Sequence, residues 1–361
     1  AHSMRHVFAT LISLVIFTSV FLIGLLPRVL GIDVTQEEGG FSKVVNTPLE
    51  KEKGVSVLFF GDMMLDRHVA LNMDRYGNEY PFLYTAELFK SADFVVANAE
   101  GVFSVNDSVT KGVEHAPLRF TFATSTLPQL YALGVSALSQ ANNHNADFGR
   151  SASTYSHDAI VGAGIKVFGD FWNEEVGPVY LEKEGQKIAL IGFNEFSYTG
   201  TASVEKAIRE AVEQGAFVVV FPHWGAEYSQ DISTLQKTYA HRFIDSGADL
   251  VVGAHPHVVE PIEIYKGKAI FYSLGNFIFD QYQPHTQEAL GIRVTLYKER
   301  TDFTVIPLTL SIGQAKVAEG EVRDTILNFL KTASSTSALV KESIDMGLFS
   351  LPEINTQNLI Y

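Results

Sequence analysis

The chain has 361 residues, of which 46% are hydrophobic, no cysteine and a formal net charge of -14. This length supports one large domain with attachments, or two ordinary domains. The negative charge argues against a nucleic-acid-binding protein, because such proteins usually carry a basic surface that displaces counterions from phosphates. Without cysteine there are no disulfides or thiolate metal sites, so a metal would need His, Asp, Glu and Asn ligands.

The N-terminal part of the chain precedes the globular part. We expect residues 1–4 to be a remnant of expression cloning and residues 5–28 to form one transmembrane anchor. No residue from Val7 to Leu26 is charged, and a helix of that length spans roughly 30 Å, the thickness of a bilayer core. A cleaved secretory signal is the alternative, but its apolar region is usually shorter, about 7 to 15 residues.

The next segment, residues 29–53, is polar and contains Gly-Gly and a proline, which is typical of a linker. The few charges that flank the apolar stretch, Arg5 on one side and Arg28 and Lys43 on the other, do not predict its orientation in a membrane.

Short apolar runs recur from Val55 onward, with helical patterns between them. They are VSVLFF (55–60), FVVANA (94–99), VSALSQ (135–140), IKVFG (165–169), KIALIGF (187–193), FVVVFP (217–222), DLVVGA (249–254) and AIFYSLG (269–275). Continuous apolar strands are typical of sheets covered on both faces, so the predicted fold class is α/β, or layered α+β. Stretches 125–134 and 232–247 contain Ser or Thr near their starts and end with Gly, as capped helices do.

Two later strands, 291–297 and 303–311, are close together and are expected to pair antiparallel, which would finish a mixed sheet. The sequence thus predicts a domain over residues 54–312 and a C-terminal extension over 313–361. The extension holds one expected helix, from Arg323 to Lys331.

Polar residues that can bind a metal follow these runs. Each of five runs is followed by at least one such side chain: Asp62, Glu100, Asn143 with His144, His223, and His255 with His257. The carboxyl ends of strands form the edge of an α/β sheet where sites occur, so residues far apart in sequence can converge there. Oxygen and imidazole ligands suit Mn, Fe or Zn. The sequence therefore predicts a site for one or two divalent ions, which could activate water for attack on a phosphoryl group.

Six motifs together resemble a known family. They are GDMML (61–65), VVANAEG (95–101), NNHNADFG (142–149), HWGAEY (223–228), GAHPHVVEPIE (253–263) and YSLGNFIFDQ (272–281). Their order resembles the bacterial capsule-synthesis (CapA/PgsA-type) poly-γ-glutamate family, itself similar to calcineurin-like metallophosphoesterases. The resemblance covers roughly residues 55–285. It implies a sandwich of mixed β-sheets flanked by helices, with a single-pass anchor and an extracellular domain.

The resemblance also implies roles for individual residues. Asp62 would match the first-site aspartate and Glu100 the bridging carboxylate; Asn143, His223 and His255 would match the second-site ligands, with His257 returning to the first site. His144 would match the histidine that assists the leaving group. Two departures are visible: Met64 stands where the superfamily has the histidine of Asp-x-His, and the bridging residue is Glu rather than Asp. A single ion is therefore an alternative to a full dinuclear centre.

Some site residues have a structural interpretation beside the functional one. Arg67 could hold an anion near Asp62, because guanidinium groups pair bidentately with carboxylate or phosphate, or it could be a surface cation. Asp147 could orient His144 or simply end a turn, and His144 could be an orienting residue rather than a proton donor. Asp62 could cap the following helix instead of binding a metal.

Three functions remain open from the sequence. The first is a membrane-anchored accessory subunit of poly-γ-glutamate synthesis or export, with membrane-embedded synthase or export subunits and an anionic polymer as partners. The second is a metal-dependent phosphoesterase or other hydrolase that acts on an extracellular substrate. The third is a non-catalytic binding or structural module. The missing imidazole at Met64 favours the first and third.

Overall fold

The computed structural model describes residues 32–34, 44–46 and 53–352, apart from 114–115, 175 and 198–199. The chain divides into two compact units, residues 1–53 and 54–361. In the first unit, β1 (Ile32–Val34) pairs antiparallel with β2 (Val44–Asn46). The anchor predicted at 5–28 lies outside the described residues. Within the described part of the chain, no helix combines the length and apolarity needed to cross a membrane.

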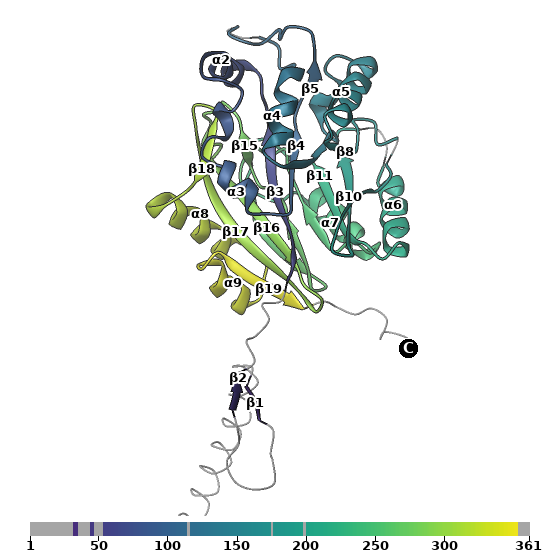
Figure 1. The fold of residues 1–361 in the computed structure, drawn as a ribbon, viewed down its shortest axis with the longest axis vertical. Coiled ribbons are helices and arrows are strands. Elements are labelled where there is room, and N and C mark those ends of the chain that lie inside the picture. Colours follow the sequence, from purple (N-terminus) through teal and green to yellow (C-terminus); the bar gives the residue numbers. More distant parts are fainter. Residues whose placement is uncertain are drawn as a thin grey trace, which may run out of the picture. The chain divides into compact units, whose positions relative to one another are not determined.

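The larger sheet of the second unit has nine strands (Figure 1). They are β3 (Val55–Met63), β4 (Phe94–Ala99), β7 (Val135–Ser139), β8 (Lys166–Phe168), β15 (Asn276–Ile278), β16 (Glu288–Leu296), β17 (Arg300–Ser311), β18 (Gln314–Val317) and β19 (Leu348–Pro352). Strands β3, β4, β7 and β8 are parallel, and β15 runs parallel to β3. Strands β16 to β19 add the antiparallel half, so the sheet is mixed.

The second sheet has six strands, in the order β13-β14-β12-β11-β10-β9. Their bounds are β9 (Val179–Lys183), β10 (Gln186–Asn194), β11 (Phe217–His223), β12 (Leu250–Val252), β13 (Ile262–Tyr265) and β14 (Lys268–Phe271). The four inner strands are parallel and the two edge strands are antiparallel to their neighbours. A small parallel pair, β5 (Val102–Ser104) and β6 (Thr121–Ala123), lies apart from both sheets.

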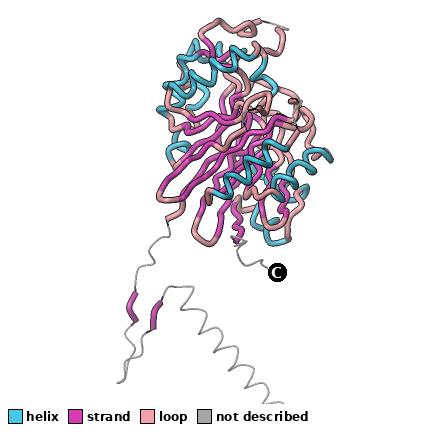
Figure 2. Tube along the Cα trace, turned by 90° about the vertical axis from the view of Figure 1, so that its right-hand side faces the viewer, coloured by secondary structure: helices cyan, strands magenta, loops and turns pink. Residues whose placement is uncertain are grey.

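The described helices pack against the two sheets, as Figure 2 shows. They are α2 (Arg67–Tyr76), α3 (Ala86–Lys90), α4 (Leu127–Ala132), α5 (Arg150–Gly162), α6 (Ala202–Glu213), α7 (Thr234–Asp245), α8 (Gly320–Ala333) and α9 (Ala338–Ile344), with short 3₁₀ turns η1 (Tyr80–Phe82), η2 (Thr124–Thr126) and η3 (Asn143–Ala146). Helices α2 to α5 pack on the nine-stranded sheet and α6 and α7 on the six-stranded sheet.

The main core lies between the two sheets. In β3, Val57 and Phe59 join that core, whereas Leu58 and Phe60 join the cluster beneath α2 to α5. Successive side chains of a strand point to opposite faces, so both faces of β3 are buried and its sequence is continuously apolar. The prediction of a layered α/β fold with mixed sheets is confirmed, as is the antiparallel pairing of β16 with β17.

Residues beyond 312, which the sequence predicts as an extension, contribute to this fold. Strands β18 and β19 both pair with β17, and the predicted helix at 323–331 lies within α8. Side chains of α8 and α9 enter the core between the sheets.

Two glycines allow the backbone to approach closely beside the predicted site. A Cβ at Gly61 would lie 1.9 Å from the carbonyl oxygen of Gly275, and a Cβ at Gly253 would lie 1.9 Å from that of Tyr272. Neither contact is sterically allowed, so both positions require glycine. Gly61 directly precedes Asp62, and Gly253 lies two residues before His255. These close contacts fix the backbone position just before Asp62 and just before His255.

Candidate metal centre

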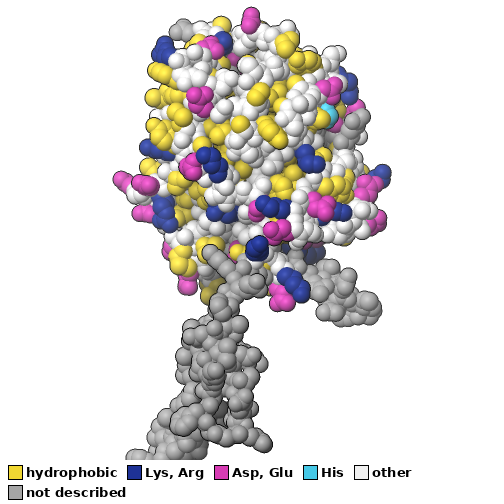
Figure 3. Space-filling view, in the orientation of Figure 1, with side chains coloured by type: hydrophobic (Ala, Val, Ile, Leu, Met, Phe, Trp, Pro, Cys, Tyr) yellow, Lys and Arg dark blue, Asp and Glu magenta, His cyan; other side chains and the backbone are white. Residues whose placement is uncertain are grey.

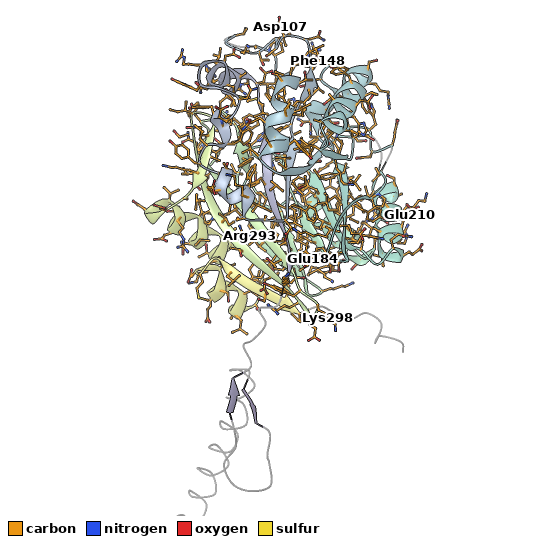
Figure 4. The ribbon with its side chains drawn as sticks, viewed as in Figure 1. Asp107, Phe148, Glu184, Glu210, Arg293 and Lys298 are labelled. Atoms are coloured by element: carbon orange, nitrogen blue, oxygen red, sulfur yellow. The ribbon has the colours of Figure 1, made fainter. Side chains whose placement is uncertain are left out.

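The structure brings together the six residues predicted as ligands, which we call the candidate cluster. Asp62 and His223 lie near or at the ends of β3 and β11, Glu100 directly follows β4, Asn143 opens η3 after β7, and His255 and His257 follow β12. The cluster thus draws on both sheets, at the carboxyl ends of their parallel strands. Phe148, which follows η3, marks this end of the sandwich in Figure 4, and Glu184 and Lys298 mark the opposite end.

Asp62, Glu100 and His257 form one group of potential ligands. Their ligand atoms lie within 4.8 Å of one another, and all three side chains are buried. His257 Nδ1 lies 3.2 Å from Asp62 Oδ2, and His257 Nε2 lies 3.8 Å from Glu100 Oε1. Asp62 also accepts a hydrogen bond from the backbone N–H of His255, at 3.1 Å. This group corresponds to the first site that the resemblance implies.

The second group shares Glu100 with the first. Glu100, His223 and His255 again place ligand atoms within 4.8 Å of one another. His223 Nε2 lies 2.9 Å from Asn143 Oδ1 and 3.0 Å from His255 Nδ1. The three side chains would therefore surround an ion placed beside Glu100. Glu100 is thus shared by the two groups.

The cluster has the electrostatics of a cation site. Both oxygens of Glu100 are buried and accept no hydrogen bond within the described part of the chain. Burial, followed by the charge of Asp62, raises the pKa of Glu100 well above its ordinary value. Burial also lowers the pKa of His223 well below its ordinary value and that of His255 to about 3, so both imidazoles are neutral. A divalent ion needs ionised carboxylates and neutral imidazoles, and it would remove the cost of the unpaired Glu100.

Two asparagine side chains form hydrogen bonds that orient residues of the cluster. Asn276 Nδ2 donates to Gln281 Oε1 and to the Thr286 carbonyl, so its Oδ1 accepts from His257 Nδ1, 3.0 Å away. A proton on Nδ1 leaves the lone pair on His257 Nε2, which faces Glu100. Asn98 Nδ2 donates to Asp62 Oδ1 at 2.8 Å and lies 3.2 Å from His223 Nδ1.

His144 and Asp147 form a pair beside the cluster. His144 Nδ1 lies 2.9 Å from Asp147 Oδ2, which also accepts the backbone N–H of Phe120 at 2.8 Å. The other ring nitrogen, Nε2, lies 3.9 Å from Glu100 Oε1. A carboxylate bound to Nδ1 fixes the tautomer and directs Nε2 toward the site. Asp147 therefore orients His144, in addition to following η3.

Arg67 lies at the edge of the site, and it pairs with a carboxylate. Its Nη2 is 3.1 Å from Oδ1 of Asp280, whose side chain is buried, and its guanidinium lies 6.0 Å from the centre of the Phe120 ring. The ring of His144 contacts the same Phe120 ring at 4.2 Å. Asp66, rather than Asp62, caps α2 by accepting the N–H of Arg67.

Met64 occupies the place of the missing imidazole. Its side chain is fully buried, and its sulfur lies 3.1 Å from the backbone nitrogen of Asp66. Met64 also belongs to the apolar cluster beneath α2 to α5. The departure seen in the sequence thus corresponds to a side chain buried in the apolar core.

Three side chains at the site are not among the predicted site residues, although Glu227 lies in the motif HWGAEY. Asn98 was read as part of an apolar strand, although a buried amide two residues before Glu100 is a signal for hydrogen bonding to the site. Phe196 is partly exposed and its ring lies 4.3 Å from that of His255. Glu227 is exposed, and its ligand atom lies within 4.8 Å of those of His255 and His257.

Fold and site together define a class, a layered α/β protein with carboxylates and imidazoles gathered at the carboxyl ends of its parallel strands. Residues 56–281 match the family described as bacterial capsule synthesis protein PGA_cap. The chain is 32% identical over 278 residues to the PGA biosynthesis protein CapA of Bacillus subtilis, covering 71% of this chain and 72% of that protein. The chain therefore belongs to the bacterial capsule synthesis family PGA_cap.

Two further relatives are similar to this chain. The capsule biosynthesis protein CapA of Bacillus anthracis is 29% identical over 288 residues, 74% of this chain and 70% of that protein. A probable polyglutamine synthesis accessory protein of Mycobacterium tuberculosis is 26% identical over 200 residues, 46% of this chain and 51% of that protein.

Proposed function

We propose that this protein is a membrane-anchored accessory subunit of poly-γ-glutamate capsule synthesis or export, and that its candidate cluster binds one or two divalent ions. Family membership supports the role in capsule synthesis. The uncharged stretch from Val7 to Leu26 supports the anchor. The family resemblance supports a domain outside the cell, beside membrane-embedded synthase or export subunits. The superfamily resemblance supports Mn, Fe or Zn in a metallophosphoesterase-like site.

One observation carries the metal-binding part of the proposal. Glu100 is fully buried, and neither of its oxygens has a hydrogen-bond partner among the described residues. An unpaired buried carboxylate destabilises a fold, whereas a carboxylate bound to a cation does not. The surrounding Asp62, Asn143 and three histidines offer the other ligands that Mn, Fe or Zn prefer.

The residues of the site divide into two roles. Asp62, Glu100, Asn143 and the three histidines would hold the ions, which supply a Lewis acid and an activated water when bound. His144, oriented by Asp147, would hold or donate a proton at its Nε2 on the side that faces Glu100.

The polymer is anionic and so is the protein, with a net charge of -14. Long-range repulsion is screened beyond about 8 to 10 Å at physiological salt. On the face shown in Figure 3, Lys and Arg lie among Asp and Glu rather than apart from them. Binding of a polyanion would therefore depend on local positive charge from the ions, because Arg67 is already paired with Asp280.

Metal analysis of the purified full chain tests the site. We expect at least one Mn, Fe or Zn per chain, and loss of that metal in His255→Ala, because His255 lies in the second ligand group. His157→Ala is the matched control, since His157 is an exposed residue of α5. A metal-free wild-type protein, or equal metal in all three proteins, would remove the proposal's chemical basis.

Gene deletion in the host tests the biological role. We expect surface poly-γ-glutamate to disappear on deletion, to return with the wild-type gene or His157→Ala, and to stay absent with His255→Ala. Unchanged polymer in the deletion strain would contradict a role in capsule synthesis.

A second candidate function is metal-dependent hydrolysis, and the His144–Asp147 pair favours it. His144 is in the position of a proton donor, with its Nε2 directed at the cluster, and Asp147 is in the position of the group that orients it. Turnover of a generic phosphodiester by the metal-loaded chain, lost in both His144→Asn and His255→Ala, would establish this function. Lack of turnover by a fully metallated chain would leave the accessory role in place.

A further inference from the structure

We propose that Glu227 is an additional metal ligand, which approaches the candidate cluster from the solvent side and compensates for the imidazole that Met64 replaces. This inference rests on the proposed metal-binding function. Glu227 does not correspond to a ligand position of the metallophosphoesterase pattern described above. It lies in the loop between β11 and α7, four residues after His223.

The geometry of this loop brings Glu227 to the site. Ligand atoms of Glu227, His255 and His257 all lie within 4.8 Å of one another. Atoms that share a first-row metal at about 2.0 to 2.2 Å each are separated by no more than about 4.4 Å. The ligand atoms are thus within about 0.4 Å of the separation that a shared ion requires, and the exposed Glu227 side chain can change rotamer.

The backbone on both sides of Glu227 is held in place. Trp224 is fully buried, and its indole N–H donates to the Tyr272 carbonyl at 2.8 Å. The Gly225 N–H donates to Glu195 Oε2 at 2.9 Å, and the Tyr228 N–H donates to the Pro256 carbonyl at 2.8 Å. The last bond ties the loop directly to the residue between His255 and His257. A ligand on such a supported turn loses little conformational freedom when it binds.

The histidine segment opposite this loop has an unusual backbone. His255 and His257 have φ values of 100° and 60°, in the region that favours glycine. Such conformations cost about 1 to 3 kcal/mol each and persist where the surrounding structure enforces them, often at functional sites. Here the Tyr228–Pro256 hydrogen bond is one of the contacts that enforce them.

The charges around the cluster favour a cation at this point. The buried Glu100 carboxylate has no hydrogen-bond partner among the described residues. Within that part of the chain, neither Lys nor Arg forms an ion pair with Asp62, Glu100 or Glu227. Three carboxylates whose only basic neighbours in the described part of the chain are imidazoles are compensated most directly by a divalent ion. The sulfur of Met64, which packs beside the Asp66 N–H, is not available for this purpose.

The experiment measures Mn²⁺ binding to the metal-depleted full chain in two ways. Titration calorimetry gives stoichiometry and affinity, and electron paramagnetic resonance follows the loss of the signal of free Mn²⁺. We expect Glu227→Gln to bind one ion fewer than the wild type, or to bind the weaker ion about tenfold or more less tightly. Glu227→Asp keeps the carboxylate and should retain a larger share of the affinity. Glu213→Gln is the matched control, because Glu213 is exposed at the end of α6.

The outcomes separate this inference from the function on which it rests. Wild-type stoichiometry and affinity in Glu227→Gln would show that Glu227 is no ligand, while the candidate cluster would remain a metal site. Absence of Mn²⁺ binding by the wild type would instead overturn the proposed metal-binding function itself. A loss in Glu227→Gln that also appears in Glu213→Gln would reflect net charge and would overturn the inference.

Discussion

At the scale of single residues, a buried acid contacts the first turn of α7. Glu260 is 1% exposed, its Oε2 accepts a hydrogen bond from Gln236 Nε2 at 2.8 Å, and its Oε1 has no partner among the described residues. Burial raises the pKa of Glu260 from an ordinary value of 4.5 to about 8; the Gln236 hydrogen bond opposes this, and the charges of Glu195 and Asp231 add to it. Glu260 is therefore protonated in the folded protein at neutral pH.

This raised pKa predicts how stability changes with pH. The folded state holds a proton on Glu260 that the unfolded state releases above about pH 4.5, so the stabilisation is complete below that pH and is lost as pH rises toward 8. Glu260→Gln mimics the protonated acid and should remove this slope, which is at most about 1.4 kcal/mol per pH unit. Urea unfolding of both proteins should give similar free energies at pH 5 and a more stable variant at pH 8.5. Parallel curves over this range would contradict a buried neutral acid.

The six residues of the candidate cluster could be predicted from the sequence because each lies at the end of an apolar run or just after it. The carboxyl ends of such runs are where sites form in α/β sheets. Asn98 was not predicted, since an amide inside such a run reads as part of the strand until its partners Asp62 and His223 are seen. Glu227 lies in a loop where periodicity carries no information. Its place beside the histidines depends on the bond from Tyr228 to Pro256, which joins segments that the sequence cannot pair.

At the scale of elements, α7 shows why some helix ends are predictable. Ser233 Oγ accepts the Gln236 N–H at 3.1 Å, and Gln236 Oε1 accepts the Ser233 N–H at 2.8 Å, which together form a capping box. The helix ends before Gly247, whose φ of 113° suits glycine. The Ser start and Gly stop seen in the sequence are therefore the residues that bound this helix.

Removing the cap of α7 should destabilise the protein. Ser233→Ala leaves the N–H of Gln236 without its acceptor, and we expect a loss of about 1 kcal/mol in the free energy of unfolding. Ser151→Ala in the first turn of α5 is the control, because Ser151 is exposed and should change stability by less than about 0.5 kcal/mol. Equal effects of the two substitutions in urea unfolding would show that the capping box contributes nothing specific.

At the scale of the whole molecule, the C-terminal segment completes the sandwich. Strand β19 pairs with β17, whose residues lie about 45 positions earlier, with Phe349 opposite Phe303. Phe349 is 3% exposed, and its ring stacks on that of Phe303 at 4.9 Å. The sequence showed only a weakly patterned tail here, because a five-residue edge strand is defined by its distant partner rather than by its own periodicity.

Truncating Phe349 tests whether this strand stabilises the domain. We expect Phe349→Ala to cost about 3 to 5 kcal/mol, as for other buried aromatic side chains that leave a cavity. Leu348→Ala is the control on the same strand, since Leu348 is 47% exposed. Thermal and urea unfolding should separate the two variants clearly. A Phe349→Ala protein as stable as Leu348→Ala would mean that β19 packs only loosely on β17.

The length of strand β3 sets the distance between the start of the domain and the candidate cluster. The strand begins at Val55, which pairs with Leu296 of β16, and holds Asp62 near its other end. Nine residues at about 3.3 Å each make roughly 27 to 30 Å. The length of β3 therefore separates the residue at which the first strand of the sandwich begins from the carboxylates of the candidate cluster.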